Sequence, residues 1–209
     1  MVNLEAHAAL PRVMVWYRSM AGSLIIRQQY TDYYPGMTIS IEQRLGRLEA
    51  IEAIRCLKAR YFHACDNKLP NQIRVCFAEG DIDLRYGRVG NFTNREQLVE
   101  IFTQYACHDH IIEMHHGQNP QIEILDDNTA SAIWGLYYYL IETKQNTVTQ
   151  LAGFYDDGYI RVGGEWKMCK SWYEVTSTQI FDLSEGLARV IFAGGQAPTD
   201  VDDPSKQAG

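Results

Sequence analysis

Ile41–Asn67 reads IEQRLGRLEAIEAIRCLKARYFHACDN, and this stretch decides the fold. Ser40 and Gln43 have the spacing of a capping box, in which a hydroxyl and an amide side chain satisfy the first unpaired backbone donors of a helix. Apolar side chains then recur at steps of three and four, the period of one helical face: Leu45, Leu48, Ile51, Ile54, Leu57, Tyr61 and Cys65. We therefore expect one long helix that presents an apolar stripe to the rest of the domain.

A length of 209 residues indicates a single domain with a tail, or at most two small domains, and the hydrophobic content of 46% is normal for a soluble globular protein. A net charge of −7 without a basic block disfavours nucleic-acid binding, and no apolar run approaches the roughly 18 residues of a membrane span. The five cysteines show no C-x-x-C spacing. We interpret them as reduced thiols of a cytoplasmic protein.

Residues 1–36 differ from the rest, with arginines scattered among apolar residues and without the pattern of a secretory signal. Because Met37 stands directly before the lead-in to the long helix, we interpret Met37 as a natural start and residues 1–36 as a loosely ordered arm. Residues 37–192 are assigned to one domain. Residues 193–209 are rich in Gly, Pro, Asp and Gln, and we expect a disordered tail there.

After the long helix, the pattern passes through short helices and then becomes rich in strands. Alternation of polar and apolar residues predicts strands, and helical spacing after a Thr or Asn cap predicts helices. The expected helices are 71–77 and 93–106, and the expected strands are 81–86, 111–117, 121–125, 130–142, 149–162 and 165–176.

Short turns join the last strands, which implies antiparallel neighbours. Gly163-Gly164 has the composition of a tight hairpin turn that needs positive φ. The fold class is therefore α+β: a cone-shaped, curved antiparallel sheet wrapped around the long N-terminal helix and enclosing a cavity.

The order of these elements and four motifs resemble the SnoaL-like branch of the nuclear-transport-factor-2-like (NTF2-like) superfamily. The motifs are IRCLKARYFHACD at 54–66, MHHGQNPQIEI at 114–124, DDNTASAIW at 126–134 and GFYDDGYIRVGGEWKM at 153–168. The nearest functional subgroup is the cofactor-independent dehydratases, such as scytalone dehydratase and bile-acid 7α-dehydratase. The resemblance implies catalytic roles for Tyr61 and Asp66, five residues apart on the helix, and for a strand histidine.

Two adjacent histidines compete for the strand position. Neighbours on a strand point to opposite faces, so only one of them can face inward. His115 is preferred to His116, because its distance to Pro120 matches the family spacing better. The chain departs from its relatives at two places: tyrosines stand at 137–139 where scytalone dehydratase has a second histidine, and lysines stand where several relatives carry an arginine after the hairpin tryptophan.

These residue types suit the removal of water beside a carbonyl, which needs a base for the C–H, an acid for the departing hydroxyl and a donor for the developing oxyanion. A histidine held by a carboxylate keeps one tautomer and accepts a proton near neutral pH. We expect Asp66 and His115 to hydrogen-bond inside the cavity, with Tyr61 in the same pocket. The expected activity is a dehydratase or hydratase without a cofactor, acting on a hydrophobic polycyclic hydroxy-carbonyl compound of steroid, terpenoid or polyketide type.

The expected substrate-binding residues are aromatic side chains and the second histidine: Phe62, Phe77, His116, Trp134, Phe154 and Trp172. Each catalytic candidate also has a structural interpretation: Tyr61 as a core tyrosine, Asp66 as a turn residue and His115 as a buried strand histidine. Their combination at family spacing favours the functional one. No carboxylate pattern completes a metal site around the histidines at 108, 110, 115 and 116, so no metal is expected.

Two other classes of function stay open. One is an isomerase or cyclase that uses the same pocket with other donors. The other is a non-catalytic small subunit of a ring-hydroxylating dioxygenase, which has this fold and an added N-terminal arm. A homo-oligomer is expected because Tyr137–Tyr139 places aromatic rings on both faces of one strand, so that at least one ring lies outside the cavity. The resemblance to the dehydratases implies a trimer rather than a dimer.

Overall fold

The computed structural model describes residues 15–18, 24–27 and 40–184, and the chain divides into two units, Met1–Ser40 and Ile41–Gly209. In the first unit, β1 (Val15–Arg18) and β2 (Leu24–Arg27) pair antiparallel. Most of the predicted N-terminal arm and all of the predicted tail, 193–209, lie outside the described residues.

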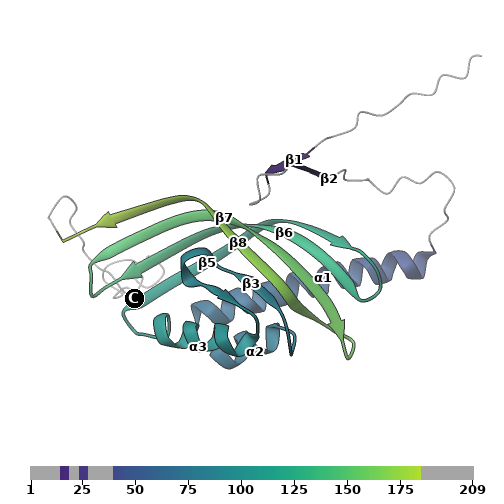
Figure 1. Cartoon of the computed structure of the whole chain (residues 1–209), viewed down its shortest axis with the longest axis horizontal. Coiled ribbons are helices and arrows are strands. Elements are labelled where there is room, and N and C mark those ends of the chain that lie inside the picture. The colour runs from purple at the N-terminus through teal and green to yellow at the C-terminus, as the bar shows by residue number, and fades with distance from the viewer. Residues whose placement is uncertain (1–14, 19–23, 28–39, 185–209) are drawn as a thin grey trace, which may run out of the picture. The chain divides into compact units, whose positions relative to one another are not determined.

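The second unit combines helices with a six-stranded curved sheet, so the predicted α+β class is confirmed (Figure 1). Its helices are α1 (Ile41–Asp66), α2 (Pro70–Cys76), the 3₁₀ turn η1 (Gly87–Val89) and α3 (Arg95–Tyr105). Its strands are β3 (Asp83–Arg85), β4 (Asn91–Phe92), β5 (Ile111–Ile124), β6 (Thr129–Glu142), β7 (Thr147–Val162) and β8 (Glu165–Asp182).

The strand order is β4-β3-β8-β7-β6-β5, and every pair is antiparallel except β3 with β8. The sheet is therefore mixed rather than wholly antiparallel. Alternation of side chains reports which face of a strand is buried and not the direction in which the strand runs. The sequence pattern of β3 could not reveal the parallel pairing for this reason.

The long helix α1 is buried only along its C-terminal half. Ile54, Leu57 and Cys65 are buried, whereas Leu45 and Leu48 of the same stripe are exposed. The prediction of a helix ending near Asn67 is confirmed, but the sheet covers only part of the stripe. Helical spacing predicts a face and cannot tell how far the partner surface extends along it.

Several local predictions are confirmed, while several strand boundaries differ from the expected ones, such as β3, which is Asp83–Arg85 rather than 81–86. Asn94 caps α3 by accepting from the backbone N–H of Gln97 at 3.0 Å. Gly163 and Gly164 both have positive φ, 59° and 87°, in the turn between β7 and β8. The two strands expected around Pro120 form one strand, β5, with a register shift between Gln118 and Gln121. The last strand, β8, continues six residues beyond its predicted end.

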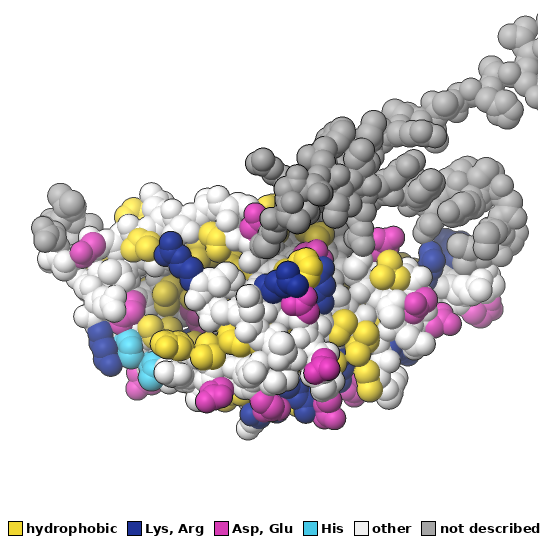
Figure 2. All heavy atoms as spheres, in the orientation of Figure 1, with side chains coloured by type: hydrophobic (Ala, Val, Ile, Leu, Met, Phe, Trp, Pro, Cys, Tyr) yellow, Lys and Arg dark blue, Asp and Glu magenta, His cyan; other side chains and the backbone are white. Residues whose placement is uncertain are grey.

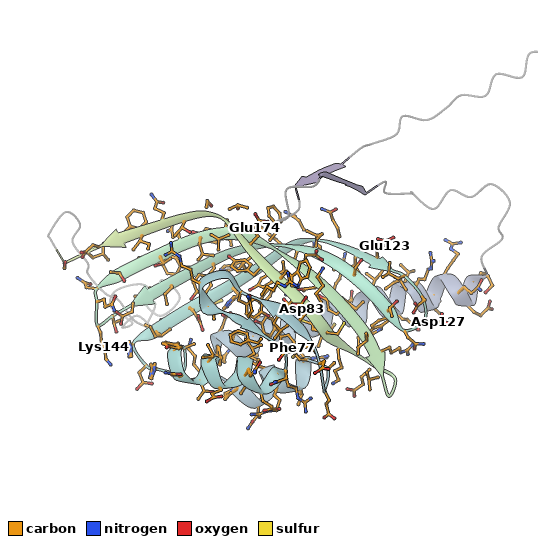
Figure 3. The ribbon with its side chains drawn as sticks, viewed as in Figure 1. Phe77, Asp83, Glu123, Asp127, Lys144 and Glu174 are labelled. Carbon is orange, nitrogen blue, oxygen red and sulfur yellow. The ribbon has the colours of Figure 1, made fainter. Side chains whose placement is uncertain are left out.

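The core lies between the inner face of the sheet and the helices, where Phe77 is fully buried beneath the strands (Figure 3). On the face shown in Figure 2, acidic, basic and apolar side chains are interspersed. No helix within residues 40–184 combines the length and the apolar content needed to cross a membrane.

Candidate active site

Asp66 and His115 meet at the C-terminal end of α1. The last residue of the helix presents its carboxylate to β5, where Oδ1 lies 2.6 Å from His115 Nδ1. The backbone N–H of His115 donates to the same carboxylate, at 3.1 Å to Oδ1 and 3.2 Å to Oδ2. Both side chains are 12% exposed. The expected contact is therefore present, and Asp66 holds both the ring and the backbone of His115.

Two aromatic rings hold the imidazole of His115 in place. Phe62, one helical turn before Asp66, stacks on it with centroids 5.5 Å apart and planes 12° apart. Tyr138 of β6, which pairs with His115 in the sheet, meets the imidazole edge-on with ring centroids 4.8 Å apart. Gly117 leaves room for the Phe62 ring, because a Cβ at that position would lie 2.3 Å from Phe62 Cε2.

A second polar cluster lies directly beside this pair. Glu113, two residues before His115 on β5, accepts from Lys68 Nζ at 2.6 Å and from the Tyr138 hydroxyl at 2.7 Å. Burial, and then the neighbouring charge of Glu113, raise the pKa of Tyr138 well above its usual value. The phenol therefore keeps its proton across the working range of an enzyme and remains a hydrogen-bond donor.

Tyr61 lies one ring further from the pair. It is buried, packs against Phe62 and meets Phe77 edge-on at 5.4 Å. Its hydroxyl donates to the hydroxyl of Tyr86 over 3.4 Å. Burial raises its pKa well above the usual value for a phenol, and Tyr86 adds to that rise. Among the predicted residues, Phe62 thus joins the pair directly, while Tyr61 and Phe77 support it from behind.

A fully buried ion pair lies deeper between α1 and the sheet. Lys58 Nζ is 2.7 Å from Asp157 Oδ2, and both side chains are 0% exposed. Asp157 also accepts from Tyr159 at 2.8 Å and from Ser171 at 2.7 Å. The Lys58 ammonium lies 3.7 Å from the centroid of the Tyr155 ring. Burial lowers the pKa of Lys58, and the carboxylate of Asp157 opposes that shift.

The structure corrects the expected positions of three substrate-binding candidates. His116 is exposed and neighbours Tyr137 on the outer face of the sheet. Phe154 is 53% exposed there as well. Trp172 is covered by Lys170 and Arg85, on the face opposite to that of its neighbours in β8. All three belong to the strand phase that points away from α1, whereas Trp134 is buried inside and donates to Tyr159 at 3.0 Å.

The comparisons with known proteins agree with this architecture. Residues 46–171, more than half of the chain, match the profile of the SnoaL-like domain. The chain belongs to the SnoaL-like family. Among solved structures, it is similar to a protein assigned as a scytalone dehydratase from Novosphingobium aromaticivorans DSM 12444, with 22% identity, a TM-score of 0.61 and coverage of 74% of this chain and 99% of that one.

Two further neighbours of this SnoaL-like domain have different assignments. A hexachlorocyclohexane dehydrochlorinase, LinA type 2, shares 19% identity at a TM-score of 0.63, over 72% of this chain and 97% of that one. A protein assigned as an aromatic ring hydroxylase, from Novosphingobium aromaticivorans, shares 19% identity with a TM-score of 0.55. The match covers 69% of this chain and 95% of that one. At such identities these likenesses establish the fold.

In this SnoaL-like domain the interior is filled with packed rings. Tyr155 contacts Phe62, Tyr86 and Tyr173, with centroids 5.8, 6.2 and 4.6 Å apart. Neither of two depressions on the surface of the described residues is lined by Asp66 or His115. One has a volume of about 460 Å³ and is lined by 108–110 with 143–144; the other, of about 320 Å³, lies on the outer sheet face around Phe154.

No three metal-ligating side chains converge anywhere in the described part of this domain.

The sequence reasoning missed residues whose signal was present. Lys58 stands four residues after Ile54, inside the buried helical stripe, and Glu113 stands two residues before His115, on the same strand face. A charged residue at the period of a buried face marks a polar group that needs a partner. The fold decides which residue that partner is: Asp157 for Lys58, and Lys68 for Glu113.

Proposed function

We propose that this protein is a cofactor-independent hydro-lyase, a dehydratase or hydratase, in which Asp66 and His115 perform the acid–base chemistry. The contact of 2.6 Å between Asp66 Oδ1 and His115 Nδ1 carries the proposal. Membership of the SnoaL-like family supports the lyase class, since structural neighbours include a protein assigned as a dehydratase and a dehydrochlorinase, both of which eliminate a leaving group.

In this proposal each nitrogen of His115 has its own role. The Asp66 carboxylate can only accept, so the neutral imidazole carries its proton on Nδ1 and leaves the Nε2 lone pair free. Nε2 removes a proton from the carbon next to a carbonyl, the C–H electron pair forms the double bond, and the C–O bond to the hydroxyl breaks. Asp66 stabilises the imidazolium that forms. Hydration is the same path in reverse.

The imidazolium returns this proton from Nε2 to the departing hydroxide, which leaves as water, so that His115 is neutral again at the end of the reaction. The oxyanion that develops on the carbonyl must also find a hydrogen-bond donor. Tyr61 is our candidate for that donor, as the resemblance implies. Its hydroxyl is bonded to Tyr86, so its contribution requires that this 3.4 Å contact be exchanged for one to the substrate. The substrate class that fits is a hydrophobic, ring-containing hydroxy-carbonyl compound, because Phe62 and Tyr138 flank the base with aromatic surface.

A non-catalytic role is the second candidate, and the packed interior favours it. Tyr61, Phe62 and Tyr155 occupy the space between helix and sheet in which a substrate would lie. A substrate could bind only if it displaced some of these rings or reached His115 from the rim. Steady-state turnover separates the two candidates, because a binding subunit has no activity of its own.

The test is turnover of a panel of hydroxylated steroid, terpenoid and aromatic polyketide ketones, followed by ultraviolet absorbance of the new conjugated double bond. Asp66→Asn and His115→Ala should each lower kcat by about 10² to 10⁴. The double variant should lose little beyond the worse single one, because the two residues act as a unit. His116→Ala, on the outer face, is the matched control and should stay within about threefold of the wild type.

Tyr61→Phe should lower kcat by less than either variant of the pair if the phenol serves only the oxyanion. Loss of activity in His116→Ala with retention in His115→Ala would overturn the assignment of the base. Absence of turnover across the panel, together with capture of a larger oxygenase subunit, would favour the non-catalytic role.

A further inference from the structure

The cluster of Lys68, Glu113 and Tyr138 has no role in the chemistry above, yet it borders the base. Glu113 and His115 are two residues apart on one face of β5, which places their α-carbons about 7 Å apart. Tyr138 contacts both, with its ring against the imidazole and its hydroxyl on Glu113. A buried carboxylate so close to a base needs a reason, because its charge acts on the base as well.

We infer that Lys68 and Glu113 are positioning residues whose opposite charges cancel beside His115, so that Asp66 is left as the net charge that acts on the imidazole. This inference rests on the proposed function, since it concerns the same base. It adds two residues to the site and assigns them an electrostatic effect that can be measured without substrate.

The contacts show why the cancellation is local. Lys68 Nζ lies 2.6 Å from Glu113 Oε1, and the side chains of Lys68 and Glu113 are 22% and 7% exposed. The second carboxylate oxygen, Oε2, is held by Tyr138 at 2.7 Å. Glu113 is therefore fixed from two sides, whereas Lys68 reaches the cluster from the rim. It lies two residues after the end of α1, in the left-handed backbone region with a φ of 56°.

Other ionisable groups near the imidazole contribute little net charge. Cys65 of α1 has its pKa raised by burial, so its thiol is neutral, and Tyr138 of β6 remains a neutral phenol for the same reason. Lys58 lies on the far side of the Phe62 contact and is compensated by Asp157. Of the described groups that face His115 from α1, the turn after it, β5 and β6, those that carry charge are Asp66, Lys68 and Glu113.

The sign of each perturbation follows. Lys68→Met leaves an uncompensated carboxylate near the imidazole, which favours the imidazolium and should move the titration midpoint of His115 to higher pH by about one unit. Glu113→Gln leaves an uncompensated ammonium and should move it to lower pH. That second shift should be smaller, because Lys68 can turn toward solvent while Glu113 is held by Tyr138. The double variant should return to within about 0.3 units of the wild type.

The experiment is an NMR titration of the His115 ring in the full chain without substrate, with the same variants examined for the acid limb of the pH–rate profile. Glutamine at 113 can still accept from Tyr138, so the ring keeps its support. Lys170→Met is the matched control: Lys170 forms an ion pair with Asp156 at 2.9 Å on the outer face, and its loss should leave the midpoint unchanged.

Opposite shifts that cancel in the double variant would support the inference, because a loss of packing alone would move all variants the same way. Shifts of one sign, or shifts no larger than that of Lys170→Met, would overturn it. If the midpoints shift as expected and no substrate is turned over, the proposed function fails while the charge balance stands. If turnover is found and the midpoints do not move, the reverse holds.

Discussion

Replacement of Lys58 by methionine should destabilise the fold through charge rather than through volume. The methionine chain fills nearly the same space against Tyr155, so the change leaves little cavity. It does remove the cation from a carboxylate, Asp157, that is 0% exposed. Loss of one partner of a buried ion pair costs about 3–5 kcal/mol. Asp157 keeps the hydroxyls of Tyr159 and Ser171, which places this variant near the lower end, about 3 kcal/mol.

In a domain of this size, such a loss lowers Tm by about 6–12 °C. Urea unfolding of the full chain, followed by tryptophan fluorescence and circular dichroism, gives the free energy of unfolding. Asp157→Asn should cost about 2–3 kcal/mol, less than Lys58→Met, because the stranded lysine, whose pKa burial already lowers, can release its proton. The double variant should cost no more than either single one, since no charge is then left unpaired.

The matched control is the exposed ion pair of Lys170 with Asp156. Lys170→Met should cost less than about 1 kcal/mol, because solvent screens a surface pair. Additive losses in the Lys58 and Asp157 double variant would refute the reasoning, and so would a Lys58→Met protein as stable as the control. Either result would mean that the attraction between Lys58 and Asp157 does not offset the cost of burying their two charges.

Three further predictions follow from other parts of the structure. Gly117→Ala should push the Phe62 ring off His115 and cost about 1–3 kcal/mol of unfolding free energy; unchanged ring-current shifts of the imidazole would contradict this. Burial raises the pKa of Tyr173 to about 12, so the folded state binds more protons than the unfolded state between about pH 10 and 12 and stability falls as pH rises through that window. Tyr173→Phe should therefore lose less stability than the wild type between pH 10 and 12, as measured by urea midpoints. Exposed Phe154 and Tyr137 on the outer sheet face support a homo-oligomer, so Phe154→Glu should lower the mass found by light scattering, and a monomeric wild type would end that proposal.

The sequence supported the elements of the site more strongly than their arrangement. The helical spacing up to Cys65 and the strand around His115 were both readable, and so was the rule that His115 and His116 point to opposite faces. The contact between Asp66 and His115 was expected only through the family resemblance. It joins residues 49 positions apart, so no local pattern reports it.

The errors at Phe154 and Trp172 have one origin, the phase of strands that carry aromatic residues on both faces. Phe154 precedes Tyr155, and Trp172 precedes Tyr173, so hydrophobicity does not distinguish the inner residue from the outer one. The structure places Tyr155 and Tyr173 inside, in contact at 4.6 Å.

The sequence by itself determined the long helix, the Gly163-Gly164 hairpin turn and the capped helix α3, because each of these depends on residues within four positions of one another. Only the tertiary structure decided that Lys58 is buried opposite Asp157, that Glu113 is shared by Lys68 and Tyr138, and that the first turns of α1 remain exposed. Those outcomes depend on where a curved sheet crosses a helix, and that crossing is set by the packing of many distant side chains at once.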